Sequence, residues 1–307
     1  MRIGIDVGGT KIEITALADD NRVLWRERTK TPHGDYRATI HTIRDLVHSA
    51  ESVLGTNGSV GLAIPGTISE VTGLVKNANS TALIGHPLDK DMQAALERPV
   101  RVANDANCFA LSEAKDGAAD GHDVVFGVIL GTGVGGGICV GGRVLKGAHA
   151  IAGEWGHNPL PWPAPEEQPG PACYCGRHGC IETWCSGPAL TRRFRVSTGR
   201  TWSPTEIDAA ADSGDPLARA AVSQYLDRLA RALSIVVNIV DPDAIVLGGG
   251  LSNIRALYRE LPERVAGYAF TPELPARILK NVHGDSSGVR GAAWLWPLEE
   301  VANGLPA

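Results

Sequence analysis

The sequence lacks the features of a membrane protein, a secreted protein or a nucleic-acid binder. No stretch approaches the roughly 20 apolar residues that a membrane-spanning helix needs, and residues 2–6 read as a strand with no secretory hydrophobic region before them. There are 29 Lys and Arg residues against 34 Asp and Glu, so no basic face is evident and the net charge is -5. We therefore expect a cytoplasmic protein that binds neither a membrane nor nucleic acid.

The six cysteines could form three disulfides, but Cys173, Cys175 and Cys180 stand in one short window whose spacing fits a metal site better. Three thiolates and the imidazole of His157 make a tetrahedral zinc set. A closed set of four ligands leaves no open position for water, so we predict a structural zinc. Free cysteines, and His178 as the fourth ligand, are the alternatives.

Two glycine-rich turns occur in similar settings. The segments "IGIDVGGTKIEITALADDNRVL" and "GVILGTGVGGGICVGGRVL" both read strand, glycine turn, strand, tight turn, strand. We interpret this as an internal duplication at the scale of a domain. It predicts two α/β lobes whose glycine turns face each other across a cleft.

The length of 307 residues is enough for two domains. We predict an N-terminal α/β lobe over residues 1–121, closed by a C-terminal helix at 288–307. The C-terminal α/β lobe is expected over residues 122–287, with the zinc-binding segment at 154–182. Within it, Asp215 as N-cap and Pro216 as first residue predict the start of a long helix.

Each glycine turn is of a kind that brings backbone N–H groups close to an oxyanion. Neither matches a Walker A loop or a Rossmann fingerprint, because each connects two strands. Thr10 adds a hydroxyl donor, and Asp6 at a strand end could hold magnesium through water. The triplet Gly248–Gly250 follows a strand and could let an adenine or ribose lie against bare backbone. The alternatives are ordinary turns.

Asn104 and Asp105 stand between a predicted strand and a predicted helix. Asp105 could accept the proton of a sugar hydroxyl as a general base, or it could simply cap the helix. Glu154, Glu182 and Asn79 offer the acceptors that a polyol requires. Their alternative roles are those of solvated acids and a turn residue.

Together, several segments resemble the ROK family of bacterial sugar kinases over essentially the whole chain: "IGIDVGGTK", "GLAIPG", "NDANCFALSEA", "LGTGVGGGI", "AGEWGH", "CYCGRHGCIE", "DPDAIVLGGGLSN" and "HGDSSGVRGAAW". The resemblance implies an actin/hexokinase-like (ribonuclease H-like) duplicated two-lobe α/β fold with an interlobe active-site cleft. It implies ATP and magnesium in that cleft, and transfer of the γ-phosphoryl group to a sugar. It also implies a homodimer, as is frequent in the family.

By match to the family motifs, Asp105 would be the catalytic base, and Asn104, Glu154, His157 and Glu182 would contact the sugar. His157 would bind zinc through one ring nitrogen and the sugar through the other. The residues that would bind ATP and magnesium are Asp6, Gly8, Gly9, Thr10, Lys11, Gly131, Thr132, Gly133, Gly135, Gly136, Gly248, Gly249, Gly250 and Asn253.

The substrate-side segments "KNANST", "EWGHNPLPW" and "HGDSSGVRGAAWLWP" resemble those of fructokinases. We therefore expect fructose as the sugar and fructose 6-phosphate as the product. The glycine tract and "NDANCFALSEA" resemble N-acetylglucosamine kinases equally well, which makes that activity the alternative. A sugar-sensing protein without turnover is a further alternative. Family repressors carry an N-terminal helix-turn-helix, and because this chain starts at its first strand we do not expect DNA binding.

Overall fold

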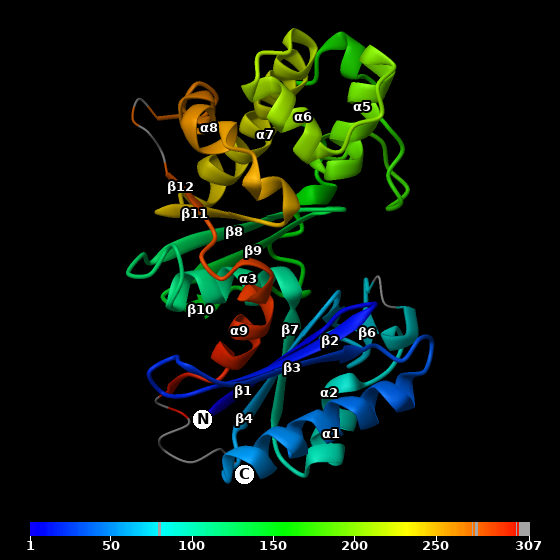
Figure 1. Ribbon diagram of the computed structural model, residues 1–307, viewed down its shortest axis with the longest axis vertical. Coiled ribbons are helices and arrows are strands. Elements are labelled where there is room, and N and C mark those ends of the chain that lie inside the picture. Colours follow the sequence, from blue (N-terminus) through cyan, green and yellow to red (C-terminus); the bar gives the residue numbers. More distant parts are fainter. Residues whose placement is uncertain (79–80, 272, 274–275, 299, 301–307) are drawn as a thin grey trace. The chain divides into compact units, whose positions relative to one another are not determined.

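The computed structural model describes residues 1–78, 81–271, 273, 276–298 and 300 (Figure 1). The chain forms two compact units. The first consists of Met1–Gly117, Gly142–Ala152 and Asp285–Ala307, and the second of Ala118–Gly141 and Gly153–Gly284. None of the helices in the described ranges has the length and apolar composition that crossing a membrane would require.

The first unit is built on a five-stranded sheet with the order β3-β2-β1-β4-β7. The antiparallel pairs are β1 with β2 and β2 with β3, and the parallel pairs are β1 with β4 and β4 with β7. The strands are β1 (Arg2–Val7), β2 (Lys11–Leu17), β3 (Val23–Lys30), β4 (Ser59–Ile64) and β7 (Val100–Asn104). A small ribbon, β5 (Thr67–Ile68) with β6 (Val75–Lys76), and a 3-10 turn, η1 (Thr81–Leu83), complete it.

Helices cover both faces of this sheet (Figure 1). One face carries α1 (Tyr36–Leu54) and α2 (Leu88–Leu96), and the other carries α3 (Asp105–Lys115) and α9 (Ser287–Trp294). The helix α9 packs unusually close to the strands, because a Cβ atom on Gly4 or Gly61 would collide with its backbone carbonyls. Glycine in β1 and β4 therefore sets the distance between sheet and helix.

The second unit repeats this arrangement around β9 (Val134–Val140), β8 (Val124–Leu130), β11 (Ala244–Gly248) and β12 (Arg277–Lys280), in that order. The first two strands pair antiparallel and the others parallel, as in the first sheet. The predicted duplication is therefore confirmed. Its helices are α4 (Glu182–Cys185), α5 (Gly187–Thr198), α6 (Pro204–Asp212), α7 (Pro216–Val240) and α8 (Ala256–Ala266).

Local rules explain where the long helix α7 begins and ends. Asp215 is its N-cap and accepts hydrogen bonds from the backbone N–H groups of Leu217 and Ala218, at 2.9 Å each. Pro216 takes the first helical position, where no N–H is needed. Asp241 ends the helix in a left-handed conformation, with φ of 47°. The predicted start of this helix is thus confirmed.

The segment of residues 142–152 groups with the first unit, although it continues the hairpin of the second sheet. It contains β10 (Arg143–Val144), which contacts α3, and Lys76 donates a hydrogen bond to the carbonyl of His149 at 2.9 Å. The predicted lobes, residues 1–121 and 122–287, were proposed as independent folding units. Their boundaries remain a prediction.

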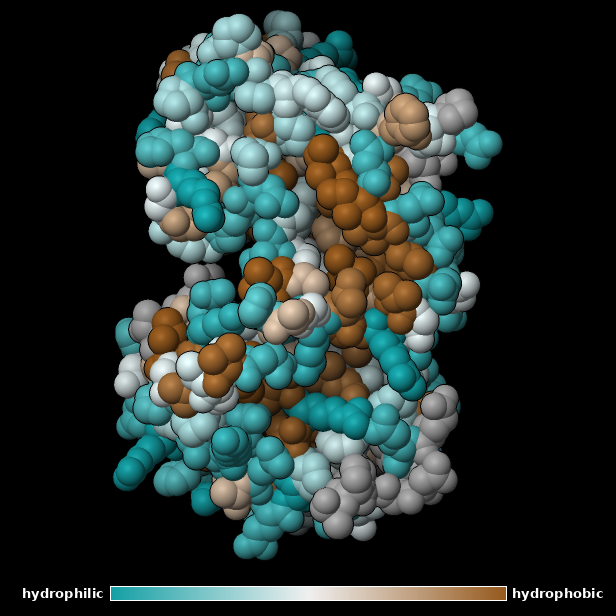
Figure 2. All heavy atoms as spheres, turned by 180° about the vertical axis from the view of Figure 1, so that it is seen from behind, coloured by the Kyte–Doolittle hydropathy of each residue, from teal (hydrophilic) through white to brown (hydrophobic). Residues whose placement is uncertain are grey.

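Hydrophilic side chains cover most of the face shown in Figure 2, with apolar side chains gathered among them. The most exposed large apolar residues of the described ranges include Phe270, Val71 and Val196. The predicted homodimer remains a prediction, because the structure describes a single chain.

Candidate active site

The strand-to-helix junction of the first unit settles which residue caps α3. Asn104, the last residue of β7, is the N-cap, and its side-chain oxygen accepts a hydrogen bond from the N–H of Ala106 at 2.9 Å. Asp105 is the first residue of the helix and also accepts from Ala106, at 2.8 Å. The alternative in which Asp105 is the N-cap is therefore wrong. Asn caps a helix as well as Asp does, and Asn104 stands one residue earlier, at the position where the cap is needed.

The first glycine turn joins β1 to β2 as a tight hairpin. The N–H of Gly8 donates to the carbonyl of Lys11 at 3.0 Å, and the hydroxyl of Thr31 donates to the carbonyl of Gly8 at 2.7 Å. Gly9, Thr10 and Lys11 are exposed at the tip. The turn therefore presents backbone and a hydroxyl to solvent, as a phosphate site requires.

Asp6 stands at the end of β1, immediately before this turn. Burial, together with the negative charges of Asp105 and Glu13, raises the pKa of Asp6 to about 7. The negative charge of Asp105 is therefore close enough to act on Asp6, the other predicted functional carboxylate of the first unit. A magnesium ion would suit this place, because it takes oxygen ligands and would offset the repulsion between them.

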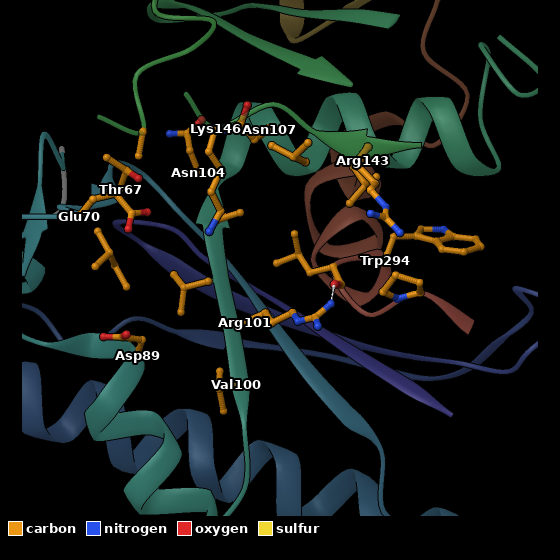
Figure 3. A pocket seen from close by; sticks show the side chains of 18 of the residues that line it. Thr67, Glu70, Asp89, Val100, Arg101, Asn104, Asn107, Arg143, Lys146 and Trp294 are labelled. Carbon is orange, nitrogen blue, oxygen red and sulfur yellow. Dashed lines mark hydrogen bonds between the residues drawn. The ribbon is translucent and has the colours of Figure 1, made fainter. Parts of the chain in front are cut away.

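A cavity of about 510 Å³ in the first unit begins at Asn104 and runs beside β7 (Figure 3). Arg101 donates a hydrogen bond to the carbonyl of Leu295 at 2.6 Å along its floor and also pairs with Glu300. The buried Oδ1 atom of Asn107 has no hydrogen-bond partner in the described part of the chain. The lining includes further polar side chains: Thr67, Glu70, Asp89, Arg143 and Lys146.

The second glycine turn, between β8 and β9, is tied to the segment that contains the cysteines. The N–H of Val134 donates to Oε2 of Glu182 at 3.0 Å. A Cβ at Gly133 would collide with the same oxygen, so a side chain there would displace the carboxylate of Glu182. The carbonyl of Gly131 accepts from the N–H of Gly187 at 2.8 Å. Glu182 therefore fixes this turn, in addition to the sugar-binding role expected for it.

A second cavity, of about 720 Å³, opens beside this turn. Three of the predicted nucleotide-binding residues line it: Gly131, Thr132 and Gly250. Gly249 has φ of 79°, and a Cβ there would collide with the carbonyl of Leu130, so that glycine is required at the end of β11. The side chain of Asn253 donates to the carbonyl of Gly250 at 3.3 Å and supports that edge of the cavity.

Helix α5 supplies lining residues of this cavity that no sequence motif indicated: Thr191, Arg192 and Arg195. Arg192 donates to the carbonyl of Thr183 at 2.9 Å. Arg195 is exposed, and no hydrogen-bond partner of its guanidinium lies within the described ranges. In the sequence, these lining residues are indicated only by a run of basic residues on a helix. Such a run usually forms the solvent-exposed face of the helix.

Gly135 and Gly136, which were expected to contact the nucleotide, both lie against Trp155. The indole N–H of Trp155 donates to the carbonyl of Gly135 at 3.0 Å, and a Cβ on Gly136 would approach the Trp155 ring to 2.6 Å. Both glycines thus allow the 3-10 turn η2 (Trp155–His157) to pack against β9. Their predicted contact with the nucleotide remains a prediction.

The ligand atoms of His157, Cys173, Cys175 and Cys180 all lie within 4.8 Å of one another. The sulfur of Cys173 is 3.6 Å from Nδ1 of His157, and the sulfurs of Cys175 and Cys180 are also 3.6 Å apart. Zinc–sulfur bonds of about 2.3 Å in a tetrahedron place the sulfurs roughly 3.8 Å apart. The donor set therefore fits a structural zinc.

Two local features prepare this segment for a metal. Gly176 and Gly179 adopt φ of 86° and 70°, which lets the chain fold back between the cysteines. A backbone hydrogen bond from Arg177 lowers the pKa of Cys175 to about 7, which favours the thiolate that a metal binds. His178, the alternative fourth ligand, is exposed and lies outside the cluster.

Among the predicted sugar-binding residues of the second unit, His157 contacts a tyrosine. The hydroxyl of Tyr174 lies 2.9 Å from Nε2 of His157, and their rings meet edge to face. Loss of hydration at this hydroxyl, followed by the neighbouring Glu182, Cys173 and Glu154, raises the pKa of Tyr174 to about 12. Glu154 itself is exposed. Asn79, the remaining predicted sugar contact, lies outside the described residues.

Comparisons with known proteins agree on one family. The model of the ROK family matches residues 2–299. An N-acetyl-D-glucosamine kinase of Yersinia pseudotuberculosis is 41% identical over 299 residues, covering 96% of this chain and 98% of the relative. One from Salmonella gallinarum is 42% identical, covering 96% and 99%.

Solved structures give the same result. A ROK hexokinase from Thermus thermophilus is similar with a TM-score of 0.85 and 32% identity, covering 99% of both chains. A ROK family glucokinase from Streptomyces griseus, solved in complex with glucose and AMPPNP, has a TM-score of 0.73 and 28% identity, covering 95% and 97%. The predicted actin/hexokinase-like two-lobe α/β fold is confirmed.

The predicted closeness to fructokinases is not supported, because the relatives just named are N-acetyl-D-glucosamine kinases. The segments that favoured fructose are short, whereas the similarity to these relatives extends over nearly the whole chain. On the family itself the sequence motifs, the fold and the comparisons agree: the chain belongs to the ROK family.

Proposed function

We propose that this protein transfers the γ-phosphoryl group of ATP to N-acetyl-D-glucosamine. The observation that carries the proposal is the identity of 41–42% with N-acetyl-D-glucosamine kinases over 96% of the chain. The glucokinase structure with glucose and AMPPNP supports the general reaction class, a sugar and a nucleotide on this fold. The substrate is therefore the sugar first considered as the alternative to fructose.

Asp105 is the proposed general base. A hydroxyl oxygen of the sugar attacks the γ-phosphorus and its proton passes to the carboxylate of Asp105. The bond between the γ-phosphorus and the bridging oxygen breaks, and ADP leaves with that oxygen and the electron pair. Because Asn104 serves as the N-cap of α3, the helix does not depend on Asp105 for that role. After burial, the negative charge of Asp105 is the next cause that raises the pKa of Asp6, which places a second carboxyl group near the proposed base.

Asp6 and the first glycine turn are the proposed place for magnesium and the terminal phosphates. A magnesium ion there would neutralise charge on the phosphoryl oxygens. Gly9, Thr10 and Lys11 would contribute backbone N–H groups, a hydroxyl and one positive charge, and Gly8 would shape the turn by donating its own N–H to the carbonyl of Lys11. The exposure of Gly9, Thr10 and Lys11 at the tip of the hairpin is the structural support for this role.

The nucleoside of ATP is proposed to occupy the cavity of about 720 Å³ in the second unit. Its volume lies within the range of small-molecule sites, roughly 300–1,000 Å³. Gly131 and Thr132 would face the phosphates, and Gly250 would lie against the base or ribose. Arg195 offers a positive charge at the same cavity, which suits a polyanionic ligand.

Glu154, His157 and Glu182 are the proposed hydroxyl-binding residues of the second unit, and Asn104 and Asn79 those of the first. The zinc would brace the loop that carries His157 and the cysteines without taking part in the chemistry. Fructose remains the second candidate substrate, because the segments "EWGHNPLPW" and "HGDSSGVRGAAWLWP" resemble those of fructokinases.

A coupled assay of ADP release with purified protein tests the proposal. N-acetylglucosamine should give the highest kcat/KM in a panel that also contains glucose, mannose and fructose. A clear preference for fructose would replace the proposed substrate by the second candidate. No ADP release with any hexose would favour the sugar-sensing alternative and refute the kinase proposal.

A further inference from the structure

A third cavity, of about 340 Å³, lies in the second unit and is lined by residues of α4, α5 and α7. Its apolar lining includes Val196 of α5 and Leu217 of α7, which are 80% and 45% exposed. None of the lining residues belongs to the proposed sugar site, and only Arg192 also lines the cavity of about 720 Å³. Small-molecule sites span roughly 300–1,000 Å³. The cavity is therefore large enough for a small ligand that the proposed reaction does not use.

The charged residues among the described lining residues are all arginines: Arg192, Arg193 and Arg228. Arg228 is 7% exposed, and its Nε donates to Oε1 of Glu167 at 2.7 Å. Glu167 also binds Arg231 and does not line the cavity. Since no carboxylate of the described residues lines the cavity, its charge favours an anionic ligand.

Two of these guanidinium groups lie over the same aromatic ring. The guanidinium carbon of Arg193 is 4.3 Å from the centroid of the Trp184 ring, and that of Arg228 is 5.1 Å from it. Cation–π attraction helps to hold both groups in place. Within the described ranges Arg193 makes no ion pair or hydrogen bond, and the two Nη atoms of Arg228 have no hydrogen-bond partner. Several N–H donors are thus held at the cavity without an acceptor.

The two guanidinium groups also repel each other. Burial, followed by the positive charge of Arg228, lowers the pKa of Arg193, although the charge of Glu167 acts in the opposite direction. A bound anion would offset this repulsion, because a guanidinium group donates parallel hydrogen bonds to phosphate or carboxylate. A phosphate monoester carries a charge of about −1.5 to −2 at pH 7 and therefore matches two guanidinium groups better than a carboxylate does.

We propose that this cavity binds a small phosphate monoester with an apolar body, at a site separate from those proposed for ATP and the sugar. The phosphate oxygens accept hydrogen bonds from Arg193 and from the Nη groups of Arg228. The apolar body packs against Val196 and Leu217, the exposed apolar residues of the lining. Binding at this cavity requires neither ATP nor a hexose, so it can be tested independently of the proposed kinase activity.

Isothermal titration calorimetry of the whole protein with phenyl phosphate is the test. The wild type should bind phenyl phosphate saturably, with a Kd below about 1 mM, and should bind phenol at least about tenfold more weakly because phenol lacks the phosphate. Arg193→Gln should raise the Kd for phenyl phosphate about tenfold, since a charge-assisted hydrogen bond is lost. Ala220→Trp keeps every charge and fills the cavity from an exposed position of α7, so it should raise this Kd by at least about tenfold as well.

Arg195→Gln is the matched control, because Arg195 is on the same helix and lines the cavity of about 720 Å³ but not this one. Its Kd for phenyl phosphate should stay within about twofold of the wild-type value. If Arg193→Gln does not fold, as judged by its melting curve, Ala220→Trp decides the question.

Three results would overturn the proposal. The first is binding that is weakened by Arg195→Gln but by neither Arg193→Gln nor Ala220→Trp, which would place phenyl phosphate in the other cavity. The second is an unchanged Kd in both Arg193→Gln and Ala220→Trp. The third is the absence of saturable binding by the wild type up to about 10 mM phenyl phosphate.

Discussion

Glu167 offers the sharpest test of how the second unit is held together. It is 5% exposed and accepts hydrogen bonds from Nε of Arg228 at 2.7 Å and from Nη1 and Nη2 of Arg231 at 2.9 and 3.0 Å. Arg231 also donates to the carbonyls of Pro161 and Trp162. This group of charges connects α7 to the proline-rich approach of the zinc segment. The change Glu167→Gln should therefore destabilise the second unit.

The size of the effect follows from the ionisation of Glu167. Burial alone would raise its pKa, but hydrogen bonds from Arg231, the N–H of Ala164 and Arg228 outweigh burial and lower the pKa to about 2. Against the ordinary value of 4.5, this corresponds to about 3 kcal/mol. Breaking a buried ion pair by removing one partner costs about 3–5 kcal/mol, which agrees.

The pH dependence has a definite sign. A carboxylate whose pKa is lower in the folded state stabilises the protein above its unfolded pKa, near 4.5, and the contribution disappears as the pH falls towards 2. At pH 7, Glu167→Gln should lower the melting temperature of the second unit by about 6–12 °C. The difference from the wild type should shrink below pH 4.

Differential scanning calorimetry of the wild type, Glu167→Gln and Glu166→Gln provides the comparison. Glu166 is the exposed neighbour in the same turn, so its substitution should change the melting temperature by less than about 2 °C. An equally small change for Glu167→Gln at pH 7 would refute the reasoning. A loss that stays constant down to pH 2 would show that packing, and not charge, is responsible.

Three further predictions concern the two proposed substrate regions. Asp6→Asn should raise the melting temperature at pH 8 and leave it nearly unchanged near pH 4, because a carboxyl whose pKa is raised from 3.8 to about 7 on folding costs stability that grows as the pH rises through that interval; the same variant should lose kinase activity, and a lower melting temperature at pH 8 would contradict the account. Cys175→Ser should reduce bound zinc and stability together, whereas unchanged metal content would remove Cys175 from the zinc set. Gly133→Ala should displace Glu182 from the N–H of Val134 and impair binding of the sugar or ATP; wild-type KM values for both would show that this contact has no functional role.

The parts of the fold that follow from short-range rules could be predicted from the sequence. The N-cap and the first residue of α7 depend only on Asp215 and Pro216, and both glycine hairpins follow from local pattern. The cluster of His157 with Cys173, Cys175 and Cys180 was predictable because the three cysteines stand close together in the sequence. The two-lobe fold was predicted from the resemblance of the motifs to those of the ROK family.

Other features depend on contacts that no local pattern contains. Asn104 and Asp105 are both good caps, and only the backbone shows that Asn104 takes the position. Arg195 lines the cavity of about 720 Å³ because the start of α5 is hydrogen-bonded to the second glycine turn through Gly187 and Gly131. The contact between Tyr174 and His157 joins two residues that are 17 positions apart in the sequence. Sugar preference depends on small differences in pocket shape, which short segments do not encode.

The central claim is that the chain phosphorylates N-acetylglucosamine with Asp105 as the base. Mass spectrometry of the product formed from ATP and N-acetylglucosamine by the wild type and by Asp105→Asn tests it most directly. We expect phosphorylated N-acetylglucosamine from the wild type, and a turnover about 10²–10⁴-fold lower from the variant with sugar binding retained. Product formed by Asp105→Asn at the rate of the wild type, or no phosphorylated sugar from either protein, would contradict the account.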